Sequence, residues 1–234
     1  MGFLLESTVR AVGLITSLDR EFISIVLLSL RVSGLAVLFA TITGVGIAFI
    51  VYRIRSPFKK IIVPVLNTSM GLPPVVVGLF LYLLFSRSGP LGELGILYTP
   101  TAMVIAQWVL ATPIVAGISH AALASAGPEL RLTALSLGAT EFQSAIRVAK
   151  EMRYAILSSV VAGLGRVIAE VGAVLIVGGN IAGYTRVMTT AIALEADRGD
   201  FTLAIALGIV LLLLSLIINL LLYLFQKKGE TGDK

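Results

Sequence analysis

The sequence has no cysteine, a single histidine and little charge. Of its 234 residues, 13% are charged and 57% are hydrophobic. Without cysteine the chain has no disulfide, no thiolate metal site and no cysteine nucleophile. Soluble domains carry charge on about a quarter of their residues, and a soluble fold of this length cannot hide so much apolar surface. The composition therefore excludes a water-soluble enzyme and a disordered chain, and it favours one membrane domain.

Motifs for enzymatic chemistry are missing as well. The sequence contains no H-E-x-x-H, no G-x-S-x-G and no P-loop G-x-x-x-x-G-K-[ST]. His120 has no cluster of ligands at a suitable spacing, so we expect it to be a hydrogen-bonded packing residue. Trp108, in the middle of an apolar stretch, is expected to pack or to line a pathway. We therefore predict no catalytic residue, no metal site and no cofactor in this chain. The 18 basic residues exceed the 13 acidic ones only slightly, which gives little reason to expect nucleic acid as a partner.

Long apolar stretches are what the sequence has instead. About 20 apolar residues are needed to cross the hydrocarbon core of a bilayer. Five segments reach or approach that length, and they are residues 22–51, 61–85, 101–124, 154–177 and 201–225. The predicted fold is an all-α integral membrane domain over residues 22–225 with five transmembrane helices.

The basic residues predict the orientation of these helices, because cytoplasmic loops of membrane proteins are enriched in Lys and Arg. Three segments on one side, residues 52–60, 125–153 and the tail 226–234, carry 11 of the 18 basic residues, and the segments on the other side carry five. We expect a multi-pass protein of the cell membrane with its N-terminus outside and its C-terminus in the cytoplasm. Within the N-terminal segment 1–21, residues 3–18 are too short and too charged to span, and they predict an interfacial helix on the outer face.

The cytoplasmic segment 127–153 has the signals of two short helices. Pro128 and Glu129 are typical of a helix start, and Gly138 is typical of a left-handed C-terminal cap. A second helix is predicted to begin at Ala139-Thr140-Glu141. We interpret the segment as a knob that protrudes into the cytoplasm, although in an arbitrary membrane protein this pattern is more typical of a helix pair lying on the membrane.

Two charges lie inside the fourth predicted span. Arg166 and Glu170 are four residues apart, so on one helix they share a face. Ionisable groups are costly in a membrane, and these two should face the bundle interior and pair. One interpretation is an ion pair that locks helix packing. The other is that the Arg166 guanidinium presents positive charge near the path of an oxyanion, restrained by Glu170, and we favour packing with an electrostatic contribution.

The second predicted span contains Pro73-Pro74, which frees backbone carbonyls and bends a helix. Non-helical backbone is tolerated at membrane depth only inside protein or along a cavity. The segment from Gly71 to Pro74 is therefore a candidate gate or lining of a solute path, with a plain kink as the alternative. Three polar residues just before it would supply neutral donors to an anion: Asn67, Thr68 and Ser69.

Glycine marks two further candidates near the fourth span. Small residues, Gly172 among them, keep one side of this span narrow, which fits either a dimer interface or a pore-side face. The loop 178–183 around Asn180 is rich in glycine. It is either a nest of backbone N–H groups for an anion or, more simply, a reversal between helices.

The segment 133–140, TALSLGAT, resembles the cytoplasmic "EAA" loop of permease subunits of type I ABC importers. In that family the loop docks as a coupling helix into a groove on the ATPase subunit. The family's Glu-Ala-Ala falls on residues 132–134, where the first two positions depart, and its later Ile-x-Leu-Pro falls on residues 148–151 without the proline. The coupling residues implied by the resemblance are Leu132, Thr133, Ala134, Gly138, Ala139 and Thr140.

A second run is similar to the permeases that import molybdate, tungstate and sulfate. It reads R-x-x-x-E-x-G-A from Arg166 and continues as G-N-I-x-G-x-T from Gly179. Residues 67–78, NTSMGLPPVVVG, resemble the tungstate branch in particular, and the matches together cover residues 25–222. The resemblance implies the type I ABC importer fold, a homodimer, cytoplasmic ATPase subunits that hold ATP and Mg²⁺, and an extracytoplasmic oxyanion-binding protein.

Tungstate is the preferred cargo on this resemblance, with molybdate and sulfate as alternatives. The candidate path residues are Asn67, Thr68, Ser69, Gly71, Pro73, Pro74, Arg166, Glu170, Gly172 and Asn180. Functions of other classes predict different features. An intramembrane enzyme needs a convergent set of acids, histidines or serines at one depth. An ATP-independent anion channel or a membrane scaffold has no need of the cytoplasmic knob.

Overall fold

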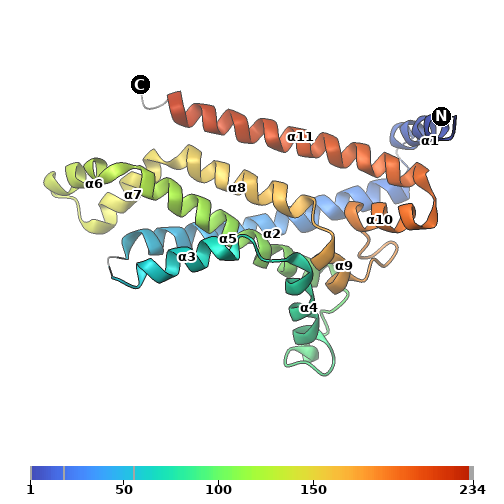
Figure 1. The fold of residues 1–234 in the computed structure, drawn as a ribbon, viewed down its shortest axis with the longest axis horizontal. Helices are drawn as coiled ribbons and strands as arrows, with labels where there is room; N and C mark the ends of the chain where they lie inside the picture. Colours follow the sequence, from blue (N-terminus) through green and yellow to red (C-terminus); the bar gives the residue numbers. More distant parts are fainter. Residues whose placement is uncertain (1, 18, 55, 232–234) are drawn as a thin grey trace. The chain divides into compact units, whose positions relative to one another are not determined.

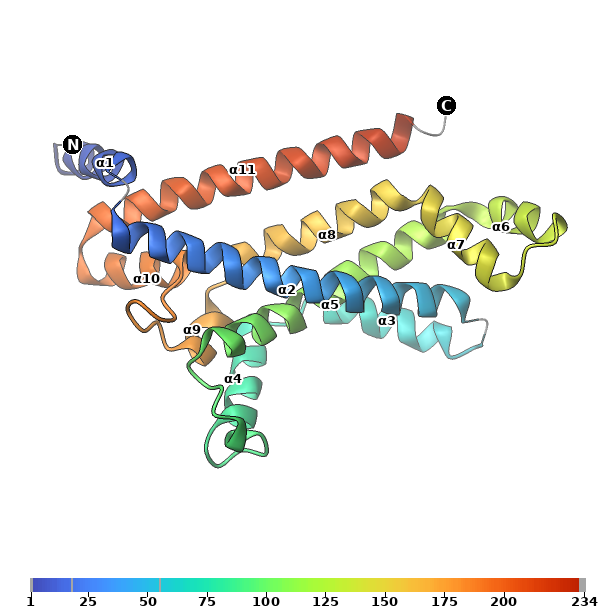
Figure 2. The same ribbon diagram turned by 180° about the vertical axis from the view of Figure 1, so that it is seen from behind.

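The computed structural model describes residues 2–17, 19–54 and 56–231, and these residues form helices without any β-strand (Figures 1 and 2). The elements in chain order are α1 (Gly2–Thr16), α2 (Arg20–Arg53), α3 (Lys59–Ser69), α4 (Pro74–Phe85), the 3₁₀ turn η1 (Gly92–Leu94), α5 (Pro100–Ser125), α6 (Gly127–Ser136), α7 (Glu141–Glu151), α8 (Arg153–Ile168), α9 (Gly172–Gly178), α10 (Met188–Arg198) and α11 (Phe201–Thr231). The predicted all-α fold is confirmed. Leu18 of the predicted N-terminal helix, Arg55 of the first basic loop and residues 232–234 of the tail lie outside the described residues.

Three helices are long and apolar enough to cross a membrane, namely α2, α5 and α11. Two further candidates are the pairs α3–α4 and α8–α9, each interrupted by a break of at most four residues and a bend of more than 40°. The described residues therefore provide three spans, or up to five if each bent pair counts as one. The apolar segments are where the sequence predicts them, and the number five stays a prediction.

The break between α3 and α4 is caused by Pro73-Pro74. Pro73 is extended, with φ −65° and ψ 121°, and Pro74 occupies the first turn of α4. Proline lacks an N–H and restricts the residue before it to extended conformations, so α3 cannot continue. The last turn of α3 instead closes with the N–H of Met70 donating to the carbonyl of Asn67 at 3.2 Å.

The chain divides into two compact units, each of which has its own core. The first unit comprises residues 1–36, 73–107 and 166–217. Its core joins α1, α2, α10 and α11 through buried Ala11, Phe22, Ile25, Met188, Ala191, Ala206 and Leu207. The start of α10 is fixed by Ser29 of α2, whose Oγ accepts the N–H of Met188 at 2.8 Å.

The second unit comprises residues 37–72, 108–165 and 218–234. Small residues bring its helices close together, as packing in membranes requires. A Cβ added at Gly44 of α2 would lie 2.9 Å from the Cβ of Val115, and one added at Gly163 of α8 would lie 2.9 Å from the Cγ2 of the same valine. Ser119 and Ser159 join α5 to α8 by a hydrogen bond of 2.7 Å between their hydroxyls. Part of the small-residue face of α8 is thus used within the chain.

Candidate translocation path and coupling helices

The ion pair predicted in the fourth span lies at the break between α8 and α9. Arg166 is in the last turn of α8, and its Nη1 lies 2.7 Å from the Oε2 of Glu170. Because α8 ends at Ile168, the expectation that both residues lie on one continuous helix is wrong. The pair forms nonetheless, with Glu170 buried at 4% exposure and Arg166 at 37%.

Glu170 itself explains why the helix is interrupted here. Its Oε1 accepts the N–H of Ala173 at 3.2 Å, so the carboxylate caps the first turn of α9. Its own carbonyl accepts a hydrogen bond from the Oγ1 of Thr189 on α10 at 2.7 Å. The carbonyl of Val167 accepts one from the Nε2 of Gln107 on α5 at 3.0 Å. Side chains from two other helices therefore satisfy the backbone groups that the break releases, which non-helical backbone at membrane depth needs.

Directly beside this break, α4 packs closely on α9, and the two lie side by side in both views (Figures 1 and 2). A Cβ added at Gly78 of α4 would lie only 2.8 Å from the Cα of Ala173. One added at Gly172 would lie 2.8 Å from the Cγ2 of Val75, directly after Pro74. The start of α4, with Pro73 and Pro74, thus lies next to Gly172. Within the first unit the structure brings these two prolines, the glycine and the Arg166–Glu170 pair together.

The polar group at the end of α3 belongs to the second unit. Asn67, Thr68 and Gly71 are exposed, whereas Ser69 is half-buried and donates its hydroxyl to the carbonyl of Val65 at 2.8 Å. A Cβ added at Gly117 of α5 would lie 3.6 Å from the Oδ1 of Asn67. Two of the three predicted neutral donors, Asn67 and Thr68, are therefore accessible, and Ser69 is committed to its own helix.

The glycine-rich loop after α9 is held by its own hydrogen bonds. Asn180 has a positive φ of 50°, and its Nδ2 donates to the carbonyl of Thr190 at 3.3 Å. The Oγ1 of Thr185 accepts the N–H of Ile181 at 2.9 Å and donates to the carbonyl of Gly178. The N–H groups of residues 184–186 all donate to the carbonyl of Ile181. These hydrogen bonds hold the reversal between α9 and α10, and a role of Asn180 in the path stays a prediction.

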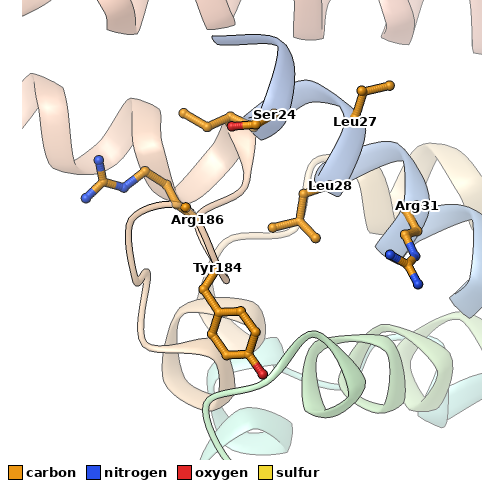
Figure 3. Close-up of a pocket in the computed structure, with 8 residues that line it drawn as sticks. Ser24, Leu27, Leu28, Arg31, Tyr184 and Arg186 are labelled. Carbon is orange, nitrogen blue, oxygen red and sulfur yellow. The ribbon is translucent and has the colours of Figure 1, made fainter. Parts of the chain in front are cut away.

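A cavity of about 250 Å³ in the first unit lies between α2 and this loop (Figure 3). Figure 3 shows Leu28 between Arg31 and Arg186, whose guanidinium groups point away from each other. The Nη1 of Arg186 lies 3.6 Å from Glu21 and 3.9 Å from Glu195. Sequence reasoning counted Arg186 among the basic residues of the outer segments and missed this network. The only signal for it would have been that Glu195 follows an apolar stretch of α10.

The helix pair predicted in the segment 127–153 is built as the sequence indicates. Helix α6 is followed by Gly138 with φ +85°, and Thr140 caps α7 by accepting the N–H of Gln143 at 3.2 Å. The two helices are joined by Arg131, whose Nη2 lies 2.8 Å from both carboxylate oxygens of Glu141. Among the predicted coupling residues, Leu132, Thr133, Gly138 and Thr140 are exposed, and Ala134 and Ala139 are half-buried.

Apolar helices long enough to cross a membrane, two further candidate spans broken at stabilised points, and an exposed pair of short helices are typical of a membrane transport subunit. The described residues hold no group of three or more His, Asp or Glu that could bind a metal ion. The family model "Binding-protein-dependent transport system inner membrane component" matches residues 34–229, and the chain belongs to this family. It is thus the permease subunit of an ABC importer, and ATP hydrolysis is left to a separate ATPase subunit.

Known proteins of similar sequence and fold agree with this assignment. The chain is 38% identical over 228 residues to the tungstate uptake system permease protein TupB of Peptoclostridium acidaminophilum, covering 97% of this chain and 100% of the relative. It is 43% identical over 217 residues to a probable anion ABC transporter permease protein of Haloferax volcanii, covering 90% and 94%. The fold is similar to that of a chain in the crystal structure of a bacterial alginate ABC transporter, with a TM-score of 0.71, 21% identity and coverage of 96% and 84%.

Proposed function

We propose that this permease imports a tetrahedral oxyanion and that its cargo is tungstate. The 38% identity with a tungstate permease, along nearly the whole length of both chains, carries this proposal. Tungstate, molybdate and sulfate are all tetrahedral dianions, so side chains of a permease discriminate poorly among them. We infer that a separate extracytoplasmic binding protein sets the selectivity, and molybdate or sulfate remains the alternative cargo.

The assembly follows from the size of the chain. One chain with at most five spans rarely encloses a solute path, so we propose a homodimer, with residues 22–225 of each copy forming the membrane domain. Residues 1–21 would lie outside as an interfacial helix, and the tail 226–234 would lie in the cytoplasm, as the distribution of basic residues favours. Two cytoplasmic ATPase subunits would bind ATP and Mg²⁺.

The path is proposed to run past the two broken spans. In the second unit Asn67 and Thr68 offer accessible neutral donors. In the first unit the half-exposed Arg166 offers a guanidinium whose charge Glu170 moderates. The other candidates act through the backbone: Ser69, Gly71, Pro73, Pro74, Gly172 and Asn180 shape the breaks and the loop. An unmoderated arginine would hold a dianion too tightly for release, since charge-assisted bonds to an oxyanion are strong.

The cargo is tested by deleting the gene and measuring cell-associated tungsten, molybdenum and sulfur by mass spectrometry at nanomolar to micromolar supply. We expect near-complete loss of tungsten accumulation, restored by a plasmid copy. Parallel loss of tungsten and molybdenum would make the cargo a shared oxyanion, and loss of sulfur alone would make it sulfate. Unchanged levels of all three elements would refute oxyanion import by this chain.

Coupling is proposed to occur through the exposed loop between α6 and α7, with Leu132, Thr133, Ala134, Gly138, Ala139 and Thr140 against the ATPase. Gly138→Val should weaken ATPase association, because a left-handed conformation costs a branched residue about 1–2 kcal/mol, or roughly five- to thirtyfold in the population of the docked loop. Co-purification of the ATPase and ATP-dependent uptake are the measurements. Gly138→Asn should retain most of both, since asparagine tolerates this conformation.

Gly199→Val is the matched control for this substitution. Gly199 has a similar φ of +80° and, like Gly138, no atom within 4 Å of an added Cβ. We propose that the segment 178–200, which contains Gly199, lies outside the cell, as the distribution of basic residues favours. Its substitution should therefore carry the same local strain without loss of ATPase association. Equal association in all three variants would refute the coupling assignment and would favour an ATP-independent channel or a scaffold.

A further inference from the structure

A cavity of about 470 Å³ lies in the second unit where α2 ends and α3 begins. We call it the cationic pocket, and it is lined by Tyr52, Arg53, Ile54, Lys59, Arg131, Glu141 and Ala145. Its walls come from the end of α2, the start of α3 and the facing sides of α6 and α7. It includes none of the predicted coupling or path residues.

The lining of the cationic pocket carries an excess of positive charge. The lining has three cations, Arg53, Lys59 and Arg131, and one carboxylate, that of Glu141. Both oxygens of this carboxylate already accept hydrogen bonds from the guanidinium of Arg131 at 2.8 Å. Among the described residues, neither Arg53 nor Lys59 forms an ion pair with a carboxylate. Two cations are thus left to face an anion.

Aromatic rings hold these two cations in place. The guanidinium carbon of Arg53 lies 5.3 Å from the centre of the Phe142 ring and 6.0 Å from that of Phe49. The Nζ of Lys59 lies 5.8 Å from the centre of the Tyr52 ring, and it donates to the carbonyl of Tyr52 at 3.4 Å. Stacking on a ring face leaves the edge of a guanidinium free to donate hydrogen bonds. The pocket is therefore partly organised for an anion before any anion binds.

The pocket also lies where the apolar part of α2 ends. The apolar run of α2 stops at Val51, and Tyr52 is of the type that membrane–water interfaces favour. After the end of α2, the next exposed apolar residues are Phe58 and Ile61, whose side chains are 68% and 63% exposed. Such exposed apolar side chains next to a cationic pocket suit a ligand with a charged head and an apolar tail.

We propose that the cationic pocket binds the headgroup phosphate of an anionic phospholipid. Arg53 and Lys59 would donate to the phosphate oxygens, and the acyl chains would lie along the exposed apolar side of α3. Basic pockets beside membrane helices bind anionic headgroups in this manner. Lipid binding in this pocket requires only that the chain spans a membrane, and it does not depend on which anion is transported.

The same chemistry has a second possible source, a free tetrahedral anion. A free anion would need no apolar surface, whereas the exposed Phe58 and Ile61 are explained by acyl chains. A carboxylate of the ATPase subunit is a further occupant, because α6 and α7 form one wall. The position at the end of the apolar run favours lipid over both, and the experiment separates the three.

The test uses the purified full-length permease in detergent and measures binding of fluorescent phosphatidylglycerol, with phosphatidylcholine and inorganic phosphate as competitors. Arg53→Gln/Lys59→Gln should bind phosphatidylglycerol about 30-fold more weakly, since each cation near an anionic headgroup contributes about a factor of five. Arg147→Gln/Lys150→Gln removes the same charge from the exposed side of α7, outside the pocket, and should change binding by less than about threefold because exposed charges are screened. Arg53→Lys/Lys59→Arg keeps the charge and should retain most of the binding.

The outcomes distinguish the three occupants. Selective loss of phosphatidylglycerol binding in the pocket variant, with weak competition by phosphatidylcholine and by inorganic phosphate, supports the proposal. Equal losses in both double glutamine variants would overturn it in favour of general surface attraction. Full competition by millimolar inorganic phosphate would overturn it in favour of a free-anion site. Unchanged lipid binding with lost ATPase co-purification would assign the pocket to the ATPase.

Discussion

Glu170→Ala is expected to reduce uptake to background and to destabilise the folded permease by about 1–3 kcal/mol, the cost of leaving a buried hydrogen-bond donor without its acceptor. The substitution removes the partner of Arg166 and the cap on Ala173 in one step, at a residue that is 4% exposed. Arg166 would be left with an uncompensated charge, and the first turn of α9 with an unsatisfied N–H. Thermal unfolding in detergent and uptake by cells measure the two effects.

Two comparisons show whether the effect belongs to this site. Glu170→Gln keeps an acceptor for the N–H of Ala173 and loses the charge, so its stability should lie between wild type and Glu170→Ala. Glu151→Ala removes the acid of another i,i+4 pair, with Arg147 at 3.5 Å, whose side chains are 37% and 61% exposed. Exposed pairs contribute about 0–1 kcal/mol, so this control should unfold close to wild type. If Glu170→Ala unfolds like Glu151→Ala, Glu170 does not stabilise the break between α8 and α9.

The same geometry separates packing from transport at Arg166. Arg166→Lys keeps a cation near Glu170, whereas Arg166→Met leaves the buried carboxylate without one. We expect Arg166→Met to impair uptake more than Arg166→Lys in cells with equal amounts of permease. Full activity in both variants would remove Arg166 from the path.

Where local chemistry decides, the sequence was sufficient to predict the structure. Pro73-Pro74 stops α3, Gly138 takes the left-handed conformation after α6, and Thr140 caps α7, as the residue types indicate. Each of these signals acts over a few residues, because it arises from a fixed φ, a missing Cβ or a side-chain oxygen next to a helix end. The ion pair between Arg166 and Glu170 was also predictable, since isolated charges in a membrane must pair.

The break between α8 and α9 was not predictable in this way. No proline marks it, and the sequence predicts one apolar helix over residues 154–177 with two charges. The break is stabilised by two side chains from other helices. Thr189 donates a hydrogen bond to the carbonyl of Glu170, and Gln107 donates one to the carbonyl of Val167. The buried face of α7 shows the same limit. Helix α7 buries Ser144, Ala145 and Val148, whereas its Phe142 is 51% exposed beside Arg53, an arrangement that hydrophobicity alone does not indicate.

The close packing of α4 on α9 leads to the second large effect, at Gly78. Gly78→Ala is expected to destabilise the permease and to abolish most uptake, because the new Cβ would lie 2.8 Å from the Cα and 3.2 Å from the carbonyl oxygen of Ala173. Both are backbone atoms of the short helix α9, so neither can move away without shifting α9 next to the cap at Glu170. Overpacking of this kind costs about 1–3 kcal/mol. Gly78→Leu should be worse, with no folded permease recovered from the membrane.

Gly34→Ala is the matched control, for which we expect the opposite change in unfolding temperature. Gly34 is also an interior helical glycine of the first unit, and a Cβ added there has no atom within 4 Å. In an interior helical position alanine is more favourable than glycine by about 0.5–1 kcal/mol, so Gly34→Ala should unfold at the same temperature as wild type or higher. The same chemical change should therefore shift the unfolding temperature in opposite directions at the two positions. If Gly78→Ala also raises it, α4 and α9 are not in close contact in the protein, and the site built on that contact fails with them.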